Sequence, residues 1–280
     1  MTSTLPVTVL VCTRERPELL VPAIESVLAG EAVPQELLVV DQSAAAHPTL
    51  GQGAGTQVRY LHRPGRGLAI ARNIGFRAAT TPVVVLLDDD MTVDPAWLRA
   101  LVGGRSTPSS VTTGRVLPAP LEPGQHPLPY AAQITLDEPA VFQGRQSRDV
   151  VPGACVSLPR DLVLGLGGFD ERLGAGTVFG SAEDNDMGLR LLDAGVEVRH
   201  VPEAIALHRN RDSPAADRRI RFAYGLGKGA LHAKWTGDRQ LTARLGRDVA
   251  RRLWLLVRRG WRDPEVLVAQ VLYLAGLVVG

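Results

Sequence analysis

Lysine and cysteine are scarce in this sequence of 280 residues. Lys228 and Lys234 are the only lysines, so the first 227 residues contain none. The two cysteines, Cys12 and Cys155, lie far apart and show none of the spacings typical of cysteine metal sites. We therefore expect no thiolate metal centre, and we expect the reducing cytoplasm as the location.

Long hydrophobic runs and a basic N-terminal region are also missing. No apolar run reaches the ~20 residues that a membrane span needs, and the longest uncharged stretch near the C-terminus is residues 266–280. The apolar run Val7–Val11 lacks the basic residues that precede a signal sequence, so we interpret it as a first buried strand.

Charge is divided unevenly along the chain. Residues 1–208 contain 16 Arg and no Lys against 23 Asp and Glu, which is a net charge of −7, and residues 209–280 have a net charge of +9. A basic tail on an acidic body suggests contact with an anionic partner such as a membrane surface. A solvated helical surface explains the same charges equally well.

Apolar runs alternate with helical patterns over the first hundred residues. We predict strands at 7–11, 36–40, 58–61 and 82–87, and helices at 17–28, 67–79 and from the Asp94-Pro95 cap to about 102. This alternation is typical of an α/β fold with a mostly parallel sheet. Ligands of such sheets bind at the carboxyl ends of the strands, where Asp41 and Asp88–Asp90 lie.

The second half of the chain is less regular. We predict strands at 150–158, 196–201 and 204–207 and a helix at 183–194. Residues 117–130 contain five prolines and suggest either a binding loop or disorder. After 210 we expect a separate basic helical region, 211–280, behind a catalytic domain of residues 1–210. Its apolar stripe Leu241, Leu245, Val249, Leu253 and Leu256 fits a membrane interface or packing on the catalytic domain.

An acidic triplet, Asp88-Asp89-Asp90, directly follows the strand at 82–87. Adjacent carboxylates repel one another unless a cation neutralises them, and oxygen ligands of this kind suit Mg²⁺ or Mn²⁺. Such an ion can stabilise a diphosphate leaving group. The pattern Asp88-x-Asp90-x-Thr92 also fits an aspartyl-nucleophile phosphatase, in which Asp88 attacks phosphorus with the help of a lysine in the protein core.

Two further sets of residues carry chemistry. Glu183-Asp184 begins a helix beyond a flexible glycine-rich segment, which suits a general base at a cleft. Gly67 begins a helix whose N-terminus could face phosphate, with Arg66 and Arg72 nearby.

The order of these motifs resembles family 2 glycosyltransferases of the GT-A fold, a Rossmann-like α/β fold. The resemblance runs from Val7 to His208, nearly three quarters of the chain. Its pieces are Cys12 to Pro17, Val39-Val40-Asp41, Gly67 to Asn73, Leu87 to Asp90, Asp94-Pro95 with Trp97-Leu98, Gly167 to Glu171, Glu183-Asp184 and His208.

The resemblance implies a role for each of these positions. The triplet is similar to the metal-binding D-x-D motif, and Asp184, next to Glu183, matches the catalytic base. The implied nucleotide-binding residues are Thr13, Arg14, Arg16, Asp41, Arg66, Arg72, Asp88 and Asp89. The implied metal ligands are Asp88, Asp90 and His208. The donor sugar or the acceptor is expected near Gly153, Ala154 and Cys155.

The sequence therefore predicts an inverting glycosyltransferase that uses Mn²⁺ or Mg²⁺ and a nucleotide-sugar donor, with UDP- or dTDP-sugars favoured. The expected acceptor is a glycan or a lipid-linked precursor, with the basic tail on the inner face of the cell membrane and no nucleic-acid partner. Two departures from the family pattern, Gln42-Ser43 and Ser181-Ala182, weaken the expected ribose contacts and stiffen the acceptor side. The alternatives are the phosphatase and a non-catalytic nucleotide- or glycan-binding module.

Overall fold

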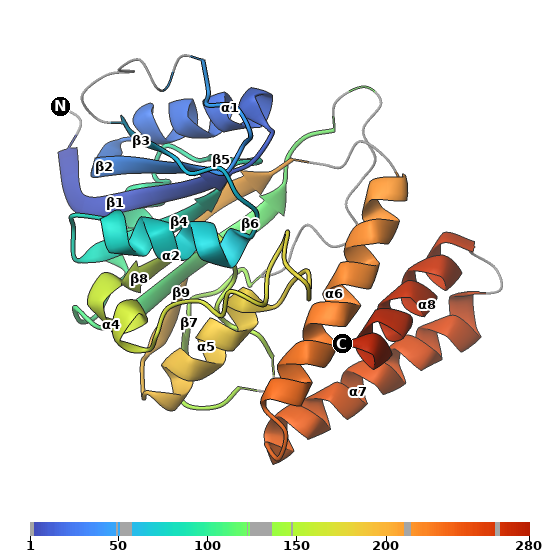
Figure 1. Ribbon diagram of the computed structural model, residues 1–280. Helices are drawn as coiled ribbons and strands as arrows, with labels where there is room; N and C mark the ends of the chain where they lie inside the picture. Colours follow the sequence, from blue (N-terminus) through green and yellow to red (C-terminus); the bar gives the residue numbers. More distant parts are fainter. Residues whose placement is uncertain are drawn as a thin grey trace.

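A central β-sheet covered by helices on both faces forms most of the molecule (Figure 1). The computed structural model describes residues 3–48, 50, 58–121, 123, 136–146, 148–209, 214–260 and 264–280. The predicted α/β class is confirmed, and the sheet contains both parallel and antiparallel pairs.

The elements follow in the order expected for the first hundred residues. The strands are β1 (Ser3–Thr13), β2 (Ala32–Asp41), β3 (Val58–His62), β4 (Val83–Asp88), β5 (Met91–Val93), β6 (Val111–Pro118), β7 (Ala140–Phe142), β8 (Val156–Pro159) and β9 (Val198–His208). The helices are α1 (Pro17–Leu28), α2 (Leu68–Ala78), α3 (Trp97–Gly103), α4 (Arg160–Gly165), α5 (Glu183–Asp193), α6 (Pro214–Lys234), α7 (Arg239–Leu255), the π-helical turn η2 (Leu256–Gly260) and α8 (Pro264–Val279).

The sheet has a parallel half and a mixed half. Its strand order is β3-β2-β1-β4-β8-β6-β9-β5, and β7 pairs with β9 beside this path. Strands β3, β2, β1 and β4 are parallel, whereas β8 is antiparallel to both β4 and β6. Strand β9 is parallel to β6 and antiparallel to β5 and β7. The parallel half therefore ends all its strands at one edge, as the sequence pattern predicted.

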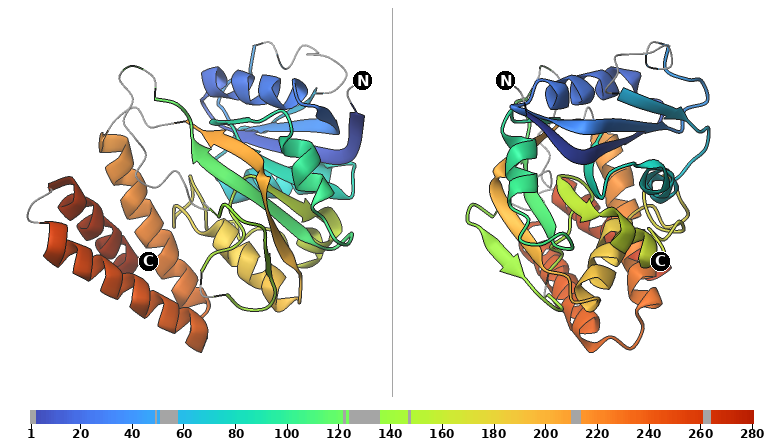
Figure 2. Two further views of the ribbon diagram at one scale, coloured as in Figure 1. Left: turned by 180° about the vertical axis from the view of Figure 1, so that it is seen from behind. Right: turned by 90° about the vertical axis from the view of Figure 1, so that its left-hand side faces the viewer.

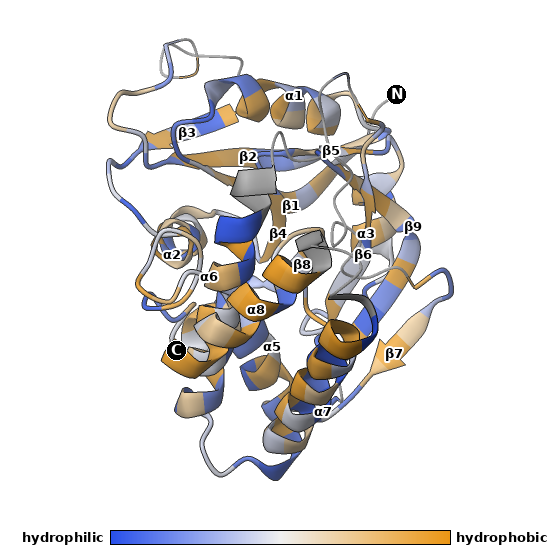
Figure 3. Ribbon diagram, turned by 90° about the vertical axis from the view of Figure 1, so that its right-hand side faces the viewer, coloured by the Kyte–Doolittle hydropathy of each residue, from blue (hydrophilic) through white to orange (hydrophobic). Residues whose placement is uncertain are grey.

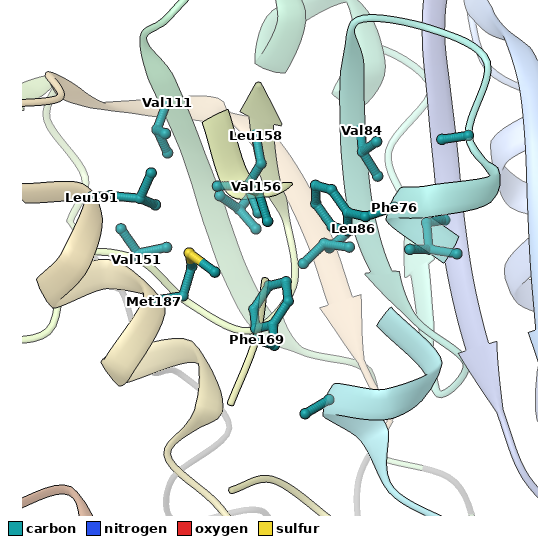
Figure 4. Packing of buried hydrophobic residues seen from close by; sticks show 14 of the residues in the cluster. Phe76, Val84, Leu86, Val111, Val151, Val156, Leu158, Phe169, Met187 and Leu191 are labelled. Atoms are coloured by element: carbon teal, nitrogen blue, oxygen red, sulfur yellow. The ribbon is translucent and has the colours of Figure 1, made fainter. Parts of the chain in front are cut away.

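Side chains of each central strand alternate between two hydrophobic clusters. In β1, Val9 and Val11 point into the cluster beneath α1 and α3, whereas Leu10 points into the cluster beneath α2, α4 and α5. Phe76, Phe169 and Met187 fill the second cluster between the sheet and α2 and α5 (Figure 4). Both faces are buried, which explains why the parallel strands are continuous apolar runs.

Three local predictions were wrong in detail. The expected strand at 150–158 is only β8, because Cys155 has a left-handed φ of 56° that interrupts an extended strand. The two strands expected at 196–201 and 204–207 are one continuous strand, β9. Helix α3 begins at Trp97 rather than after an Asp94 cap, and Asp94 accepts a hydrogen bond from the Ala96 N–H instead. The sequence reasoning did not predict β5, β6, β7 or α4.

The C-terminal helices stand to one side of the sandwich, next to α5 (Figure 2). Helices α6 and α8 pack closely because glycines face each other: a Cβ on Gly225 would lie 2.0 Å from the Tyr273 carbonyl oxygen. Leu231 of α6 and Leu241 of α7 pack with Ala182 and Leu189 of the domain. The start of the predicted apolar stripe is thus buried against the domain, whereas Leu253 at its far end is 50% exposed. Among the described residues, no helix is long and apolar enough to cross a membrane.

The bulge in β6 allows a test of how closely β6 packs on β9 and on Cys155. Register between β6 and β9 shifts at Gly114, where an added Cβ would lie 2.1 Å from the Ala204 carbonyl oxygen and 2.5 Å from Cys155 Sγ. Because the backbone oxygen cannot move away cheaply, we expect Gly114→Ala to lower the free energy of unfolding by about 1–3 kcal/mol, as overpacking does. Urea denaturation measures the change. Gly246→Ala in α7, with nothing within 4 Å, is the control and should be neutral or stabilising; equal effects of the two would contradict the packing.

Candidate active site

Three acidic or polar side chains end neighbouring parallel strands at the same level. Thr13 ends β1 opposite Asp41, which ends β2, and Cys12 pairs in register with Asp88, which ends β4. The carboxyl ends of β1, β2 and β4 therefore form one polar edge of the sheet, at the position where open α/β sheets bind ligands.

Asp89 directly follows β4 at this edge. Thr13 Oγ1 donates to Asp89 Oδ2 at 2.7 Å, and Arg16 Nη1 lies 3.2 Å from Asp89 Oδ1 and 3.4 Å from Asp90 Oδ2. Burial of the carboxyl group, together with the nearby charge of Asp90, raises the pKa of Asp89 to about 6. The triplet is thus short of positive charge even with Arg16 beside it, which is the environment that a bound cation relieves.

Asp90 and His208 come together because β5 pairs with the end of β9, with Met91 opposite His208. His208 Nε2 lies 3.5 Å from Asp90 Oδ1, and His208 Nδ1 lies 2.8 Å from the Arg209 carbonyl oxygen. A carbonyl only accepts, so Nδ1 carries the hydrogen, and in the neutral ring the lone pair of Nε2 faces the carboxylate. Two acceptors that face each other fit a divalent cation between them.

The third expected metal ligand lies differently. The carboxylate of Asp88 pairs with Arg72, with 3.4 Å between Asp88 Oδ1 and Arg72 Nη2. Burial raises the pKa of Asp88 and Asp90 adds to this, while Arg72 opposes it. In the part of the chain that the structure describes, no group of three or more His, Cys, Asp or Glu side chains has the geometry of a metal site. The structure thus brings together Asp90 and His208 but not the full predicted set.

Arg72 connects the triplet to the second acidic motif. It extends from α2, and its side chain is 3% exposed. Its guanidinium lies 2.7 Å from Glu183 Oε1, donates to the Gly153 carbonyl oxygen at 2.7 Å and stacks over the Phe169 ring. Arg72 was expected to contact the nucleotide, but these donors are engaged by protein groups.

Asp184 lies beside this group at the first turn of α5. Gly153 leaves room for it, since a Cβ at that position would lie 3.3 Å from Asp184 Oδ2 and 3.2 Å from Arg72 Nη2. Burial and then the charge of Glu183 raise the pKa of Asp184 to about 7. A carboxylate with a pKa near neutrality is suited to accept a proton at physiological pH.

The far end of the edge contains residues that the sequence reasoning missed. Asp41 is 2% exposed and accepts hydrogen bonds from Tyr60 Oη at 2.6 Å and from the Ser43 N–H at 2.8 Å. Burial and the bond to Asp41 raise the pKa of Tyr60 to about 12. The Glu15 N–H donates to Ser43 Oγ, which ties the β1–α1 loop to the end of β2. No local pattern marks Tyr60, because its contact joins two neighbouring strands.

The two remaining arginines lie on the rim. Arg14 Nε donates to the Gly65 carbonyl oxygen at 3.0 Å, and Arg66 is exposed beside Gly176. The Leu68 N–H donates to the Ala175 carbonyl oxygen, so the glycine-rich segment packs on the start of α2. A nucleotide contact of either arginine stays a prediction.

The expected sugar contacts need a correction. Ala154 is 3% exposed and Cys155 is 0% exposed, and the Cys155 thiol accepts a hydrogen bond from Trp97 Nε1 in the core. Their side chains are therefore unable to touch a sugar, and of the three only Gly153 lies beside Asp184. Most of the loop at 117–130 lies outside the described residues.

A sequence model of Glycosyl transferase family 2 matches residues 8–158, which is more than half of the chain and includes the strand-end edge with its acidic triplet.

Two curated relatives are similar over about 180 residues. Pre-mycofactocin glycosyltransferase of Mycobacterium tuberculosis is 32% identical over 183 residues, which cover 62% of this chain and 37% of that protein. Glucosyl-dolichyl phosphate glucuronosyltransferase of Haloferax volcanii is 30% identical over 178 residues, which cover 60% of this chain and 57% of that protein. The matched part thus spans less than two thirds of either relative.

Solved structures share the fold. Mannosyltransferase PcManGT from Pyrobaculum calidifontis, in complex with GDP-Man and Mn²⁺, superposes with a TM-score of 0.60 at 18% identity over 98% of this chain and 86% of that one. The expected GT-A fold is confirmed by this likeness.

The Arg72 contacts give a pH-dependent test. Removal of the guanidinium leaves Glu183 and Asp88 without their partner, and loss of one partner of a buried pair costs about 3–5 kcal/mol. Unpaired carboxyls have folded-state pKa values above their unfolded values, so stability is lost as pH rises from the unfolded pKa. We expect Arg72→Met to destabilise the protein more at pH 8 than at pH 5.5, as measured by urea denaturation.

Arg59→Met is the matched control. Arg59 also pairs with a carboxylate, Glu36, but its side chain is 45% exposed, and exposed pairs contribute about 1 kcal/mol or less. If Arg72→Met lowered the free energy of unfolding equally at pH 5.5 and at pH 8, Arg72 would not be the group that holds Glu183 and Asp88 ionised.

Proposed function

The chain belongs to glycosyl transferase family 2, and we propose that it is an inverting enzyme that moves a sugar from a nucleoside diphosphate to a hydroxyl group. The observation that carries this proposal is the contact of Arg72 with both Asp88 and Glu183. Arg72 thereby links the acidic triplet, which suits a metal-bound diphosphate, to the first turn of α5. Asp184, which follows Glu183 in that turn, suits the role of base for an acceptor hydroxyl.

Each side of the edge has a distinct task. Thr13 and Arg16 orient Asp89, and Asp41 with Tyr60 forms the polar end that receives the nucleoside. UDP- or dTDP-sugars are the proposed donors. Asp90 and His208 would hold Mn²⁺ or Mg²⁺, with Asp88 nearby; the ion would supply positive charge that stabilises the diphosphate leaving group. The Mn²⁺ in PcManGT supports this choice.

Asp184 is the proposed general base. Its carboxylate takes the proton of the acceptor hydroxyl as that oxygen forms a bond to the anomeric carbon and the bond to the diphosphate breaks on the opposite side. Because its pKa is about 7, the ionised form grows as pH rises through neutrality. We expect the rate to increase over the same interval.

The alternatives have less support. The phosphatase needs a lysine beside Asp88, but Lys228 and Lys234 pair with Asp149, Asp170 and Asp186 instead. A non-catalytic nucleotide- or glycan-binding module has no use for a carboxyl group with a raised pKa across Arg72 from the triplet. A lipid-linked acceptor is favoured over a free glycan by the name of the Haloferax volcanii relative, a glucosyl-dolichyl phosphate glucuronosyltransferase.

Nucleotide binding and turnover separate these possibilities. We expect one of UDP, dTDP, GDP and CDP to bind in a Mn²⁺-dependent way in calorimetric titrations, and Asp90→Ala to abolish the effect of Mn²⁺. With sugar derivatives of the nucleotide so identified as donors, Asp184→Asn should release nucleoside diphosphate roughly 10²–10⁴-fold more slowly, with nucleotide affinity unchanged.

Asp161→Asn is the control for this series, since the Asp161 side chain is 87% exposed and remote from the triplet. Absence of metal-dependent binding for all four nucleotides would contradict the donor assignment. Full turnover by Asp184→Asn would contradict the assignment of the base.

The tail also offers a surface for the inner face of the cell membrane. Leu253, Trp254 and Val257 are 50%, 53% and 77% exposed, and the Arg258 guanidinium lies over the Trp254 ring. Helix α8 consists mostly of apolar residues (Figure 3), and Leu267, Val271 and Val278 on it are 42%, 49% and 87% exposed. Apolar side chains next to arginines are the composition of an interfacial helix, and this surface fits an enzyme that works on lipid-linked acceptors.

Vesicle sedimentation tests the membrane contact. We expect the protein to sediment with anionic phosphatidylglycerol vesicles at 50 mM NaCl and less at 500 mM, because salt screens the attraction to arginine. Val257→Asp should weaken binding several-fold. The control is Val141→Asp, which changes a 51% exposed valine on β7. Retention of both variants on the vesicles, or no sedimentation of the unaltered protein, would contradict the proposal.

A further inference from the structure

Helix α6 packs directly on the residues that precede the proposed base. Ser181 Oγ donates to the Ala223 carbonyl oxygen at 3.0 Å, and a Cβ on Gly227 would lie 2.2 Å from Ser181 Oγ. Ala182, the next residue, adopts a left-handed φ of 76° and packs on Leu231. The entry to α5 is therefore shaped by a helix that lies outside the segment matched by the family model.

One side chain of α6 reaches further, to the first turn of α5. Lys228 Nζ donates to Asn185 Oδ1 at 2.6 Å and to Asp149 Oδ2 at 2.8 Å. Asp149 also pairs with Arg244 of α7. Although burial opposes it, these two cations hold the pKa of Asp149 well below its usual range. Lys228 thus joins three parts of the chain at the residue directly after Asp184.

The charges that face Asp184 come from four elements. Glu183 on α5 and Asp149 in the loop before β8 raise its pKa, whereas Lys228 on α6 and Arg72 on α2 lower it. Arg244 and His232 lie behind these groups. Burial lowers the pKa of His232, and the charges of Lys228 and Arg244 lower it further, so the neutral form is favoured. Arg72 is shared with Glu183 and Asp88, so Lys228 is the cation that the C-terminal helices add to this balance.

We propose that Lys228 is a positioning residue for the base: its ammonium group holds Asn185 and Asp149 together, fixes the first turn of α5 and places a positive charge beside Asp184. The C-terminal helices are then part of the active site. This inference rests on the proposed function, because it assumes that Asp184 is the base.

Lys234 provides a matched comparison two turns further along α6. It also makes two ion pairs, at 2.8 Å with Asp170 Oδ2 and at 2.8 Å with Asp186 Oδ1. Asp186 is fully buried and also pairs with Arg190 on its own helix. Lys234 therefore anchors α6 to the same helix as Lys228 does, but the main charges that act on Asp184 are those of Glu183, Lys228, Asp149 and Arg72.

The test measures the ionisation of Asp184 directly. Carbon-13 NMR of protein labelled at the aspartate carboxyl carbon follows the titration, and the signal missing from Asp184→Asn identifies the residue. Removal of a nearby positive charge disfavours the carboxylate, so Lys228→Met should move the Asp184 midpoint to higher pH by about one pH unit, a tenfold change in the ionisation equilibrium. Lys234→Met should leave the midpoint in place while it lowers thermal stability.

Two more variants keep the test decisive if Lys228→Met does not fold. Asp149→Asn removes a negative charge and should move the midpoint to lower pH, opposite to Lys228→Met. Loss of structure would also lower the midpoint, so near-UV circular dichroism must show that each variant titrated is folded. Lys228→Arg keeps the charge and should keep the midpoint near that of the unaltered protein. The inference is overturned if the midpoint is the same in Lys228→Met and Lys234→Met, or if Asp149→Asn raises it.

The outcome is separable from that of the proposed function. Titration of the unaltered protein with UDP, dTDP, GDP and CDP in the presence of Mn²⁺ tests donor binding without reference to Lys228. Intact nucleotide binding with an unmoved Asp184 midpoint removes the inference alone. Absence of binding for every nucleotide removes the proposed function, whatever the NMR titration shows.

Discussion

The organisation of this protein depends on one buried guanidinium, that of Arg72. A buried arginine is costly unless its donors and charge are met, and here Glu183, Asp88 and the Gly153 carbonyl oxygen meet them. The three partners come from α5, from the end of β4 and from the loop before β8. Arg72 thereby fixes the distance between two acidic motifs that lie nearly a hundred residues apart in the sequence.

The rest of the site follows from a shortage of positive charge. Among the described residues, Arg16 and Arg72 pair with the triplet, and burial raises the pKa values of Asp88 and Asp89. His208 Nε2 lies 3.5 Å from Asp90 Oδ1. On the other side of Arg72, Asp184 has a pKa of about 7. A displacement at an anomeric carbon needs compensation of the negative charge on the leaving group and a carboxylate that can take up a proton. The two sides of Arg72 correspond to these two requirements.

Much of this arrangement was predictable because its signals are local. The apolar strands at 7–11, 36–40 and 82–87 and the helix at 17–28 agree with β1, β2, β4 and α1, since each has a complete hydrophobic pattern within its own segment. The acidic triplet and Glu183-Asp184 stand out for the same reason. The side chains of Ala154 and Cys155, which were expected near the sugar, lie in the core, and their sequence did not indicate this because burial depends on the neighbouring strands. The bonds of Tyr60 to Asp41 and of Asp149 to Arg244 were missed, since they join distant segments.

By itself, the sequence determined the fold class, the parallel half of the sheet and the identity of its strand-end acids, because periodicity and short motifs record interactions between near neighbours. Only the tertiary structure decided the antiparallel insertion of β8, the commitment of Arg72 to Glu183, and the approach of Lys228 to Asn185 from 43 residues away. Those features depend on how closely packed elements place charges in space, and a charge exerts its effect over ångströms rather than along the chain.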